Sequence, residues 1–192
     1  MSQLYKIPFY PQIWKLDEWK DLGFKDLDEA RYWQNASCGI LCLKMAIEGV
    51  LGKQIDSISQ IIVKGRLAGA YSHKFGWSHT GLAALAISYD TEAFVLENMG
   101  VERIKSFIDQ GMLVIVSIKW AFEPARSLKE RLFFWKKKGG HLALVTGYEN
   151  DGFFVNHTSI SEGFNWENRL VEFGRFKAGF TGRGIIIGPR KI

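Results

Sequence analysis

GHLALVTGYENDGFFVNH, residues 140–157, contains two apolar segments of strand length separated by a short polar stretch. The first segment, 141–148, is mainly apolar, which is typical of a strand buried on both faces. Asp151-Gly152 is a strong hairpin signal, because glycine readily adopts the backbone angles that tight turns need. The sequence therefore predicts two neighbouring antiparallel strands, 141–148 and 153–157.

Two further strands are expected outside this hairpin. Residues 113–118 and 184–188 are dominated by β-branched residues and have the length of buried strands. Residues 4–35 are irregular and proline-punctuated at their start, with a short helix expected between 14 and 31. The sheet-forming half of the chain thus follows a first half that contains no comparable strand signal.

Helical periodicity dominates that first half. Ile40, Leu43, Ile47 and Val50 repeat with a 3.6-residue period, which predicts a helix over 37–51. Ser37 is the candidate N-cap and Gly52 the expected stop. Three more helices are expected, which begin near Asp56, at Ser78 or Thr80, and near Val101. Helices first and an antiparallel sheet second predict an α+β fold.

The length of 192 residues favours one domain over 1–192, with a helical part of about 1–110 and a sheet part of about 111–192. Hydrophobic residues make up 47% of the chain and charged residues 23%, which excludes a mainly disordered protein. The net charge is +5, but the only tight basic run is 136–138. Without a nucleic-acid-binding motif around it, that run predicts a solvated loop and no nucleic-acid partner.

The first residues lack the apolar core of a signal peptide, and no apolar run is long enough to cross a bilayer. A cytoplasmic location without membrane contact is expected, or a secreted one if a leader has been removed. The two cysteines and four histidines form no cluster at ligand spacing, so no metal or other cofactor is expected.

Cys38 is the candidate nucleophile. In the first turn of the 37–51 helix, the exposed N–H groups and the helix dipole would favour a thiolate. Gly39 would leave the sulfur accessible. The alternative is a buried cysteine that acts as a small apolar side chain. Cys42 lies deeper in the helix and is expected in the core, and a disulfide between the two would close almost no loop.

His141 is the candidate base, because it begins a strand directly after Gly139-Gly140. The alternative is a histidine that only satisfies a strand end. The hairpin would bring either Asn156 or His157 beside it, and a third group of this kind could fix the tautomer of the imidazole. Consecutive strand residues point to opposite faces, so both cannot face His141 without a bulge.

Several of these segments together resemble the C39-like cysteine peptidases, papain-like enzymes related to the processing domains of bacteriocin exporters. The resemblance runs from Ile7 to His157 and is carried by Ile7–Gln12, Cys38-Gly39 with Leu43 and Met45, Gly140–Tyr148, and Val155-Asn156. It implies a papain-like fold in which the helix of the nucleophile packs on the antiparallel sheet.

The resemblance also implies roles for individual residues. Cys38 would be the nucleophile and His141 the general base. Gln12 would be the side-chain donor of the oxyanion hole, with Gln34 as its rival, and the backbone N–H of Cys38 would be the second donor. The family's orienting Asp is replaced by His157 in this chain, and Asn156 could serve instead if the strand shifts by one residue.

These expectations define a thiol hydrolase that cleaves a peptide or amide bond of a peptide or protein through an acyl-enzyme on Cys38. The alternatives are an acyltransferase or transglutaminase-like enzyme that uses the same intermediate, and a binding module that keeps the fold with impaired catalysis. Near the expected cleft, His79 is interpreted as a capping or packing residue, with a place in the cleft lining as the alternative. Trp120 and Phe122 are interpreted as core aromatics, with a substrate wall as the alternative.

Overall fold

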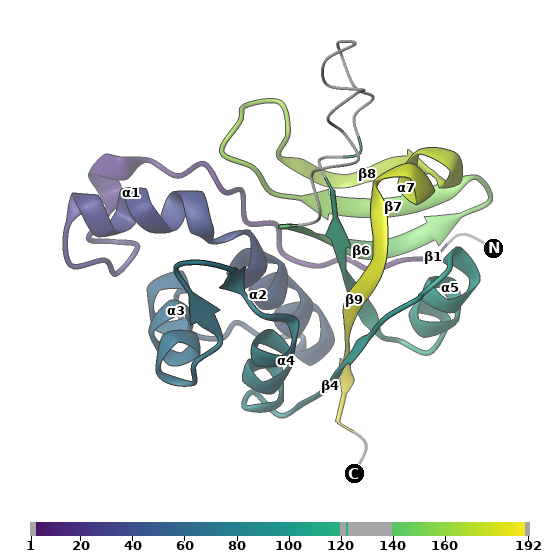
Figure 1. Cartoon of the computed structure of the whole chain (residues 1–192), viewed down its shortest axis with the longest axis horizontal. Helices are drawn as coiled ribbons and strands as arrows, with labels where there is room; N and C mark the ends of the chain where they lie inside the picture. Colours follow the sequence, from purple (N-terminus) through teal and green to yellow (C-terminus); the bar gives the residue numbers. More distant parts are fainter. Residues whose placement is uncertain (1–2, 120–121, 123–139, 191–192) are drawn as a thin grey trace.

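The computed structural model describes residues 3–119, 122 and 140–190, and has an α+β fold in which helices pack on an antiparallel sheet (Figure 1). The six main strands lie in the order β4-β9-β5-β6-β7-β8, and the short β1 pairs with β6. Their bounds are β1 Gln3–Leu4, β4 Thr91–Leu96, β5 Leu113–Ile118, β6 His141–Glu149, β7 Gly152–His157, β8 Trp166–Glu172 and β9 Phe180–Pro189. A separate two-stranded hairpin joins β2 Tyr71–Ser72 to β3 Gly76–Trp77.

The described helices lie on both faces of the sheet. They are the 3-10 helix η1 Leu16–Glu18 and the α-helices α1 Leu27–Ala36, α2 Cys38–Leu51, α3 Ile58–Leu67, α4 His79–Ile87, α5 Val101–Asp109 and α7 Phe173–Gly179. In Figure 1, α1 to α4 gather on one side of the sheet, away from α5 and α7. One apolar core lies under the first group, and a second core lies on the opposite face, under α5 and α7. None of the described helices combines the length and hydropathy needed to cross a bilayer.

The predicted hairpin is confirmed: Glu149 pairs with Gly152 at the end of the β6–β7 ladder, so the loop between them has two residues. The sequence did not predict β4 and β8. β4 pairs with β9 at the sheet edge and buries only Thr91 and Ala93, and β8 is mostly polar. The final strand, β9, inserts between β4 and β5, so two strands distant in sequence become its neighbours.

Helix α2 is more deeply buried than its periodicity predicts. Every residue from Gly39 to Glu48 is buried, because the sheet, α3 and α4 surround the helix. Gly52 ends it in the left-handed conformation with φ 65°, as expected. Ser37 is the N-cap residue of α2, as expected, but its hydroxyl makes no capping hydrogen bond and is buried without a partner among the described residues.

The buried face of α2 also carries an ion pair. Lys44 Nζ lies 2.5 Å from Glu48 Oε1, and both side chains are almost fully buried. The Tyr10 hydroxyl donates to the other carboxylate oxygen of Glu48 at 2.7 Å, and the Ile55 N–H donates to Oε1 at 2.9 Å. These hydrogen bonds satisfy the buried charges and tie the N-terminal segment to α2.

Candidate active site

Cys38 is the first residue of α2, and its side chain is half-buried. Burial raises the pKa of the thiol, but three effects act against burial: the charge of His141, a hydrogen bond with that imidazole, and hydrogen bonds from the backbone N–H groups of Leu142 and Gly39. The pKa of Cys38 is therefore below its usual value. The structure thus favours a thiolate at this position.

Cys42 lies one helical turn further along α2 and is fully buried. Burial and the neighbouring charge at Cys38 raise its pKa well above the usual value. The prediction that Cys42 is a core residue is confirmed. Of the two cysteines, Cys38 is the one whose pKa is lowered.

His141 begins β6 directly after Gly140, whose φ of 115° is a conformation that favours glycine. Its Nε2 lies 2.8 Å from the backbone oxygen of Thr158 and donates to it. The hydrogen bond with Cys38 therefore involves the other ring nitrogen, Nδ1. Burial lowers the pKa of His141, but the Cys38 thiolate and the Thr158 carbonyl outweigh burial and raise it. The two pKa values thus shift in opposite directions, as they do when a thiolate and an imidazolium interact.

The group that orients His141 is a backbone carbonyl, not a side chain. Asn156 pairs in register with Leu144, three residues along the strand from His141, and is fully buried. Its Nδ2 contacts Met45 Sδ at 3.6 Å, and its Oδ1 accepts from the Asn168 N–H at 2.7 Å. The structure therefore directs the Asn156 side chain toward α2 and β8 and does not bring it to the imidazole.

His157 lies beside His141, with ring centroids 4.7 Å apart. Its Nδ1 donates to the Phe164 carbonyl, while its Nε2 is buried and has no hydrogen-bond partner among the described residues. Burial and the nearby charge of His141 lower the pKa of His157 to about 4. His157 is therefore neutral at neutral pH, and it packs against His141 without supplying a negative charge.

The structure brings the two candidate oxyanion residues together. Gln12 is 3% exposed, and its Nε2 donates to the Gln34 carbonyl at 2.7 Å. That bond holds the Gln12 amide at the last turn of α1, four residues before Cys38, and leaves its second amide hydrogen for another acceptor. The Gln34 side chain points elsewhere, since its Nε2 donates to the Trp14 carbonyl at 3.0 Å.

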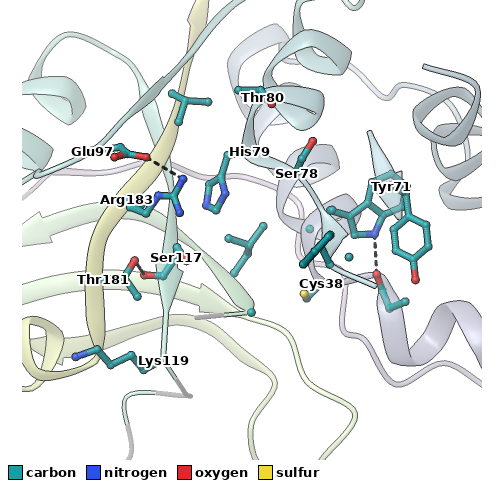
Figure 2. Close-up of a pocket in the computed structure, with 18 of the residues that line it drawn as sticks. Cys38, Tyr71, Ser78, His79, Thr80, Glu97, Ser117, Lys119, Thr181 and Arg183 are labelled. Carbon is teal, nitrogen blue, oxygen red and sulfur yellow. Dashed lines mark hydrogen bonds and ion pairs between the residues drawn. The ribbon is translucent and has the colours of Figure 1, made fainter. Parts of the chain in front are cut away.

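A groove of about 990 Å³ opens beside Cys38 (Figure 2). One wall is aromatic and includes Tyr71 and Trp77, whose indole N–H donates to the Ala36 carbonyl at 2.7 Å. His79 also lines the groove, which agrees with the alternative interpretation of this residue. It does not cap α4, because the Ser78 side chain does so by accepting from the Gly81 N–H. The groove gives a substrate access to the sulfur.

The other aromatics near the expected cleft have different positions. Phe122 is 1% exposed and stacks on Phe176 with ring centroids 5.2 Å apart, so the core interpretation of Phe122 is confirmed. Trp120 and the basic run 136–138 lie outside the described residues. In the part of the chain that is described, no three His, Cys, Asp or Glu side chains are placed to hold a metal ion.

Comparison with known proteins identifies the fold. No family model and no curated protein matches the chain. Among solved structures, a double glycine motif protease from an AMS/PCAT transporter, in complex with the leader peptide, matches with a TM-score of 0.58 and 15% identity over 97% of this chain and 94% of that one. The peptidase domain of Streptococcus ComA, a bifunctional ABC transporter in a quorum-sensing pathway, matches with a TM-score of 0.55 and 17% identity. That match covers 80% of this chain and 92% of the ComA chain.

A third solved structure, from Bacillus anthracis and described as a C39-like peptidase, matches with a TM-score of 0.63 and 13% identity over all of both chains. At these identities the likeness is one of fold. It extends over both the helical layer that carries Cys38 and the sheet that carries His141.

Proposed function

We propose that this chain, which has the papain-like fold of the C39 peptidase domains, is a thiol hydrolase that cleaves a peptide or amide bond through an acyl-enzyme on Cys38. The observation that carries the proposal is the Cys38–His141 pair, in which the pKa of the thiol is lowered and that of the imidazole is raised. Such a pair supplies a nucleophile and a proton donor at the same pH.

The first half of the proposed reaction forms the acyl-enzyme. The Cys38 thiolate attacks the substrate carbonyl, and a C–S bond forms as the carbonyl oxygen becomes negative. The backbone N–H of Cys38 and the second amide hydrogen of Gln12 are the proposed donors to that oxygen. The His141 imidazolium then gives its proton to the leaving amine, and the C–N bond breaks.

The second half regenerates the enzyme. Neutral His141 removes a proton from water, which attacks the thioester carbonyl and releases the carboxylic acid and the Cys38 thiolate. The Thr158 carbonyl, 2.8 Å from Nε2, would hold the ring in the tautomer that leaves Nδ1 facing the sulfur. A carbonyl orients the imidazole but offers less stabilisation to an imidazolium than a carboxylate does.

A peptide is the proposed substrate. One structure of the same fold is a protease bound to a leader peptide, and the groove beside Cys38 has the volume to hold several residues of an extended chain. The second candidate function is a peptide-binding module with impaired catalysis. It is favoured by one observation, the neutral His157 in the position where a carboxylate would stabilise the imidazolium.

The deciding experiment is the pH dependence of Cys38 alkylation by iodoacetamide, with adducts located by mass spectrometry, in the wild type and in His141→Gln. The wild type should react quickly at neutral pH and retain its rate into the acidic range. His141→Gln should behave as an ordinary thiol, of which only about 3% is ionised at pH 7. His73→Gln is the matched control, because His73 is exposed and bonds Tyr32 rather than Cys38.

An ordinary thiol profile in the wild type would refute the hydrolase and leave the binding module. Fast alkylation of Cys38 at neutral and acidic pH in His141→Gln as well would show that His141 does not activate the thiol. Partition of an acyl-enzyme between water and an added amine would then separate hydrolysis from acyl transfer.

A further inference from the structure

The groove beside Cys38 has a charged wall that the proposed hydrolysis does not use. His79, Glu97, Lys119 and Arg183 line it, and we call these four residues the charged wall. They come from the start of α4, the residue after β4, the residue after β5, and β9. In Figure 2, Arg183 and Glu97 lie on the strand side of the groove with His79 beside them, across from Cys38.

The cations outnumber the carboxylate in the charged wall. Arg183 Nη2 lies 2.8 Å from Glu97 Oε1, with 52% and 59% of the two side chains exposed, so Glu97 balances one positive charge. Lys119 makes no ion pair with any residue that the structure describes. Among the described residues, the wall therefore carries more positive than negative charge.

The wall also has hydrogen-bonding capacity to spare. Arginine has five N–H donors in a planar fork, and a single contact with Glu97 leaves most of them available. The Nε2 atom of His79 is shielded from solvent and has no hydrogen-bond partner among the described residues. A buried polar atom without a partner is unfavourable, so a ligand that bonds it gains affinity over one that does not.

We propose that the charged wall is a subsite for an acidic side chain, Asp or Glu, of the peptide whose carbonyl Cys38 attacks. This inference rests on the proposed function and adds the substrate class. The carboxylate bonds the free side of the Arg183 guanidinium and His79 Nε2, which lie side by side in Figure 2, and Lys119 adds a second positive charge to the groove lining. A basic side chain would be repelled by Arg183 and Lys119. An apolar side chain would leave His79 Nε2 without a hydrogen-bond partner.

The test uses tripeptide chloromethyl ketones in which the first or second residue is Glu, Gln or Lys and the other residues are Gly. Each reagent alkylates Cys38, and the second-order rate constant reports how well its side chain fits. At the peptide position that fits the charged wall, we expect the rate constant of the Glu reagent to exceed that of the Gln reagent by about 3- to 10-fold. The expected factor is modest because Arg183 is half-exposed, which weakens its interaction with a carboxylate. The Lys reagent should be the slowest.

Variants of the charged wall test whether its residues cause the preference for the Glu reagent. Arg183→Gln should remove the preference for Glu, and Glu97→Gln should increase it, because the guanidinium is then unopposed. Arg190→Gln is the matched control: it breaks the exposed Arg190–Asp90 ion pair outside the groove and should leave the preference unchanged. Equal rates for Glu and Gln, or a preference for Lys, would overturn the inference.

The two proposals fail in different ways. If iodoacetamide shows an ordinary thiol, the hydrolase is refuted, and the subsite is then judged by titrating Cys38→Ser with the same tripeptides as amides in a calorimeter. Tighter binding of the Glu peptide would support the subsite without catalysis, and equal binding would overturn it.

Discussion

His157 is a neutral neighbour of His141 and brings no negative charge to its imidazole. The neutral ring packs between His141 and Trp166, with centroids 4.7 Å and 5.1 Å away, and donates to the Phe164 carbonyl. This neighbour is consistent with a His141 whose pKa is raised chiefly by the thiolate itself.

Replacement of this ring by a carboxylate should extend the ion pair to higher pH. In His157→Asp, the added negative charge raises the pKa of His141 further, so the imidazolium persists as pH rises through the wild-type value. The NMR titration of the His141 ring measures this shift. His157→Asn, which is neutral, is the control and should not raise the pKa; an unchanged pKa in both variants would show that residue 157 has no electrostatic effect on His141.

Asn156 should matter for stability rather than for thiol chemistry. Asn156→Ala removes the contacts with Met45 and with the Asn168 N–H, and leaves the latter donor without its acceptor. We expect a loss of about 1–3 kcal/mol in the free energy of unfolding in urea and an unchanged pH profile of Cys38 alkylation. A profile like that of His141→Gln would instead make Asn156 the orienting residue.

At the residue scale, Cys38 and His141 could be named as candidates from the sequence, but the groups that surround them could not. The position of Cys38 at a helix start and that of His141 after two glycines made each a candidate, and the structure brings the two side chains together. The orienting Thr158 carbonyl has no sequence signature, because every residue has such a group. Asn156 fits the expected spacing, yet the register of β6 and β7 turns it toward α2.

At the scale of elements, the N-terminal segment is positioned by its close approach to α2. A Cβ at Gly49 would lie 2.3 Å from Ile7 Cγ2, so only glycine permits this contact. Ile7 begins the segment 7–12, which has no regular secondary structure. At its end, the Gln12 N–H donates to Asn165 Oδ1 at 3.0 Å.

Gly49→Ala should therefore destabilise the protein despite the better helix propensity of alanine. The clash displaces Ile7 and should lower the thermal midpoint. Gly174→Ala is the matched control, since a Cβ at this helical glycine meets nothing within 4 Å and should be neutral or stabilise by up to about 1 kcal/mol. Equal midpoints for the two variants would show that the N-terminal segment packs less closely than the structure indicates.

Long, strongly periodic elements were the predictable ones. The helices near 37–51 and 101–110 and the strands at 113–118 and 141–148 lie close to their expected bounds. The missed strand β8 contains Asn168 with φ 46° and several exposed polar residues, so its alternation is weak. Its pairing with β7 determines its conformation more than its own sequence does.

At the scale of the whole molecule, the site exists only when distant parts of the chain have assembled. Cys38 belongs to α2, His141 to β6, and the charged wall draws on residues from 79 to 183. The sequence could not predict the groove, because the insertion of β9 between β4 and β5 depends on pairing between remote segments.

Loss of thiol activation should coincide with global unfolding. In a urea titration, the rate of Cys38 alkylation, the far-ultraviolet circular dichroism and the tryptophan fluorescence should share one midpoint, because the helical layer and the sheet both contribute to the groove. Activation lost at lower urea, with the other two signals intact, would show that the layers separate before either unfolds.

Cys42, buried one helical turn after Cys38, is a second thiol that the fold shields from reagents and whose pKa is raised rather than lowered. A folded molecule offers an alkylating reagent one sulfur, whereas an unfolded molecule offers two. A brief pulse of reagent on a mixed sample would tag each folded molecule once and each unfolded molecule twice. Intact mass alone would then count the two populations, without an added probe or an engineered residue.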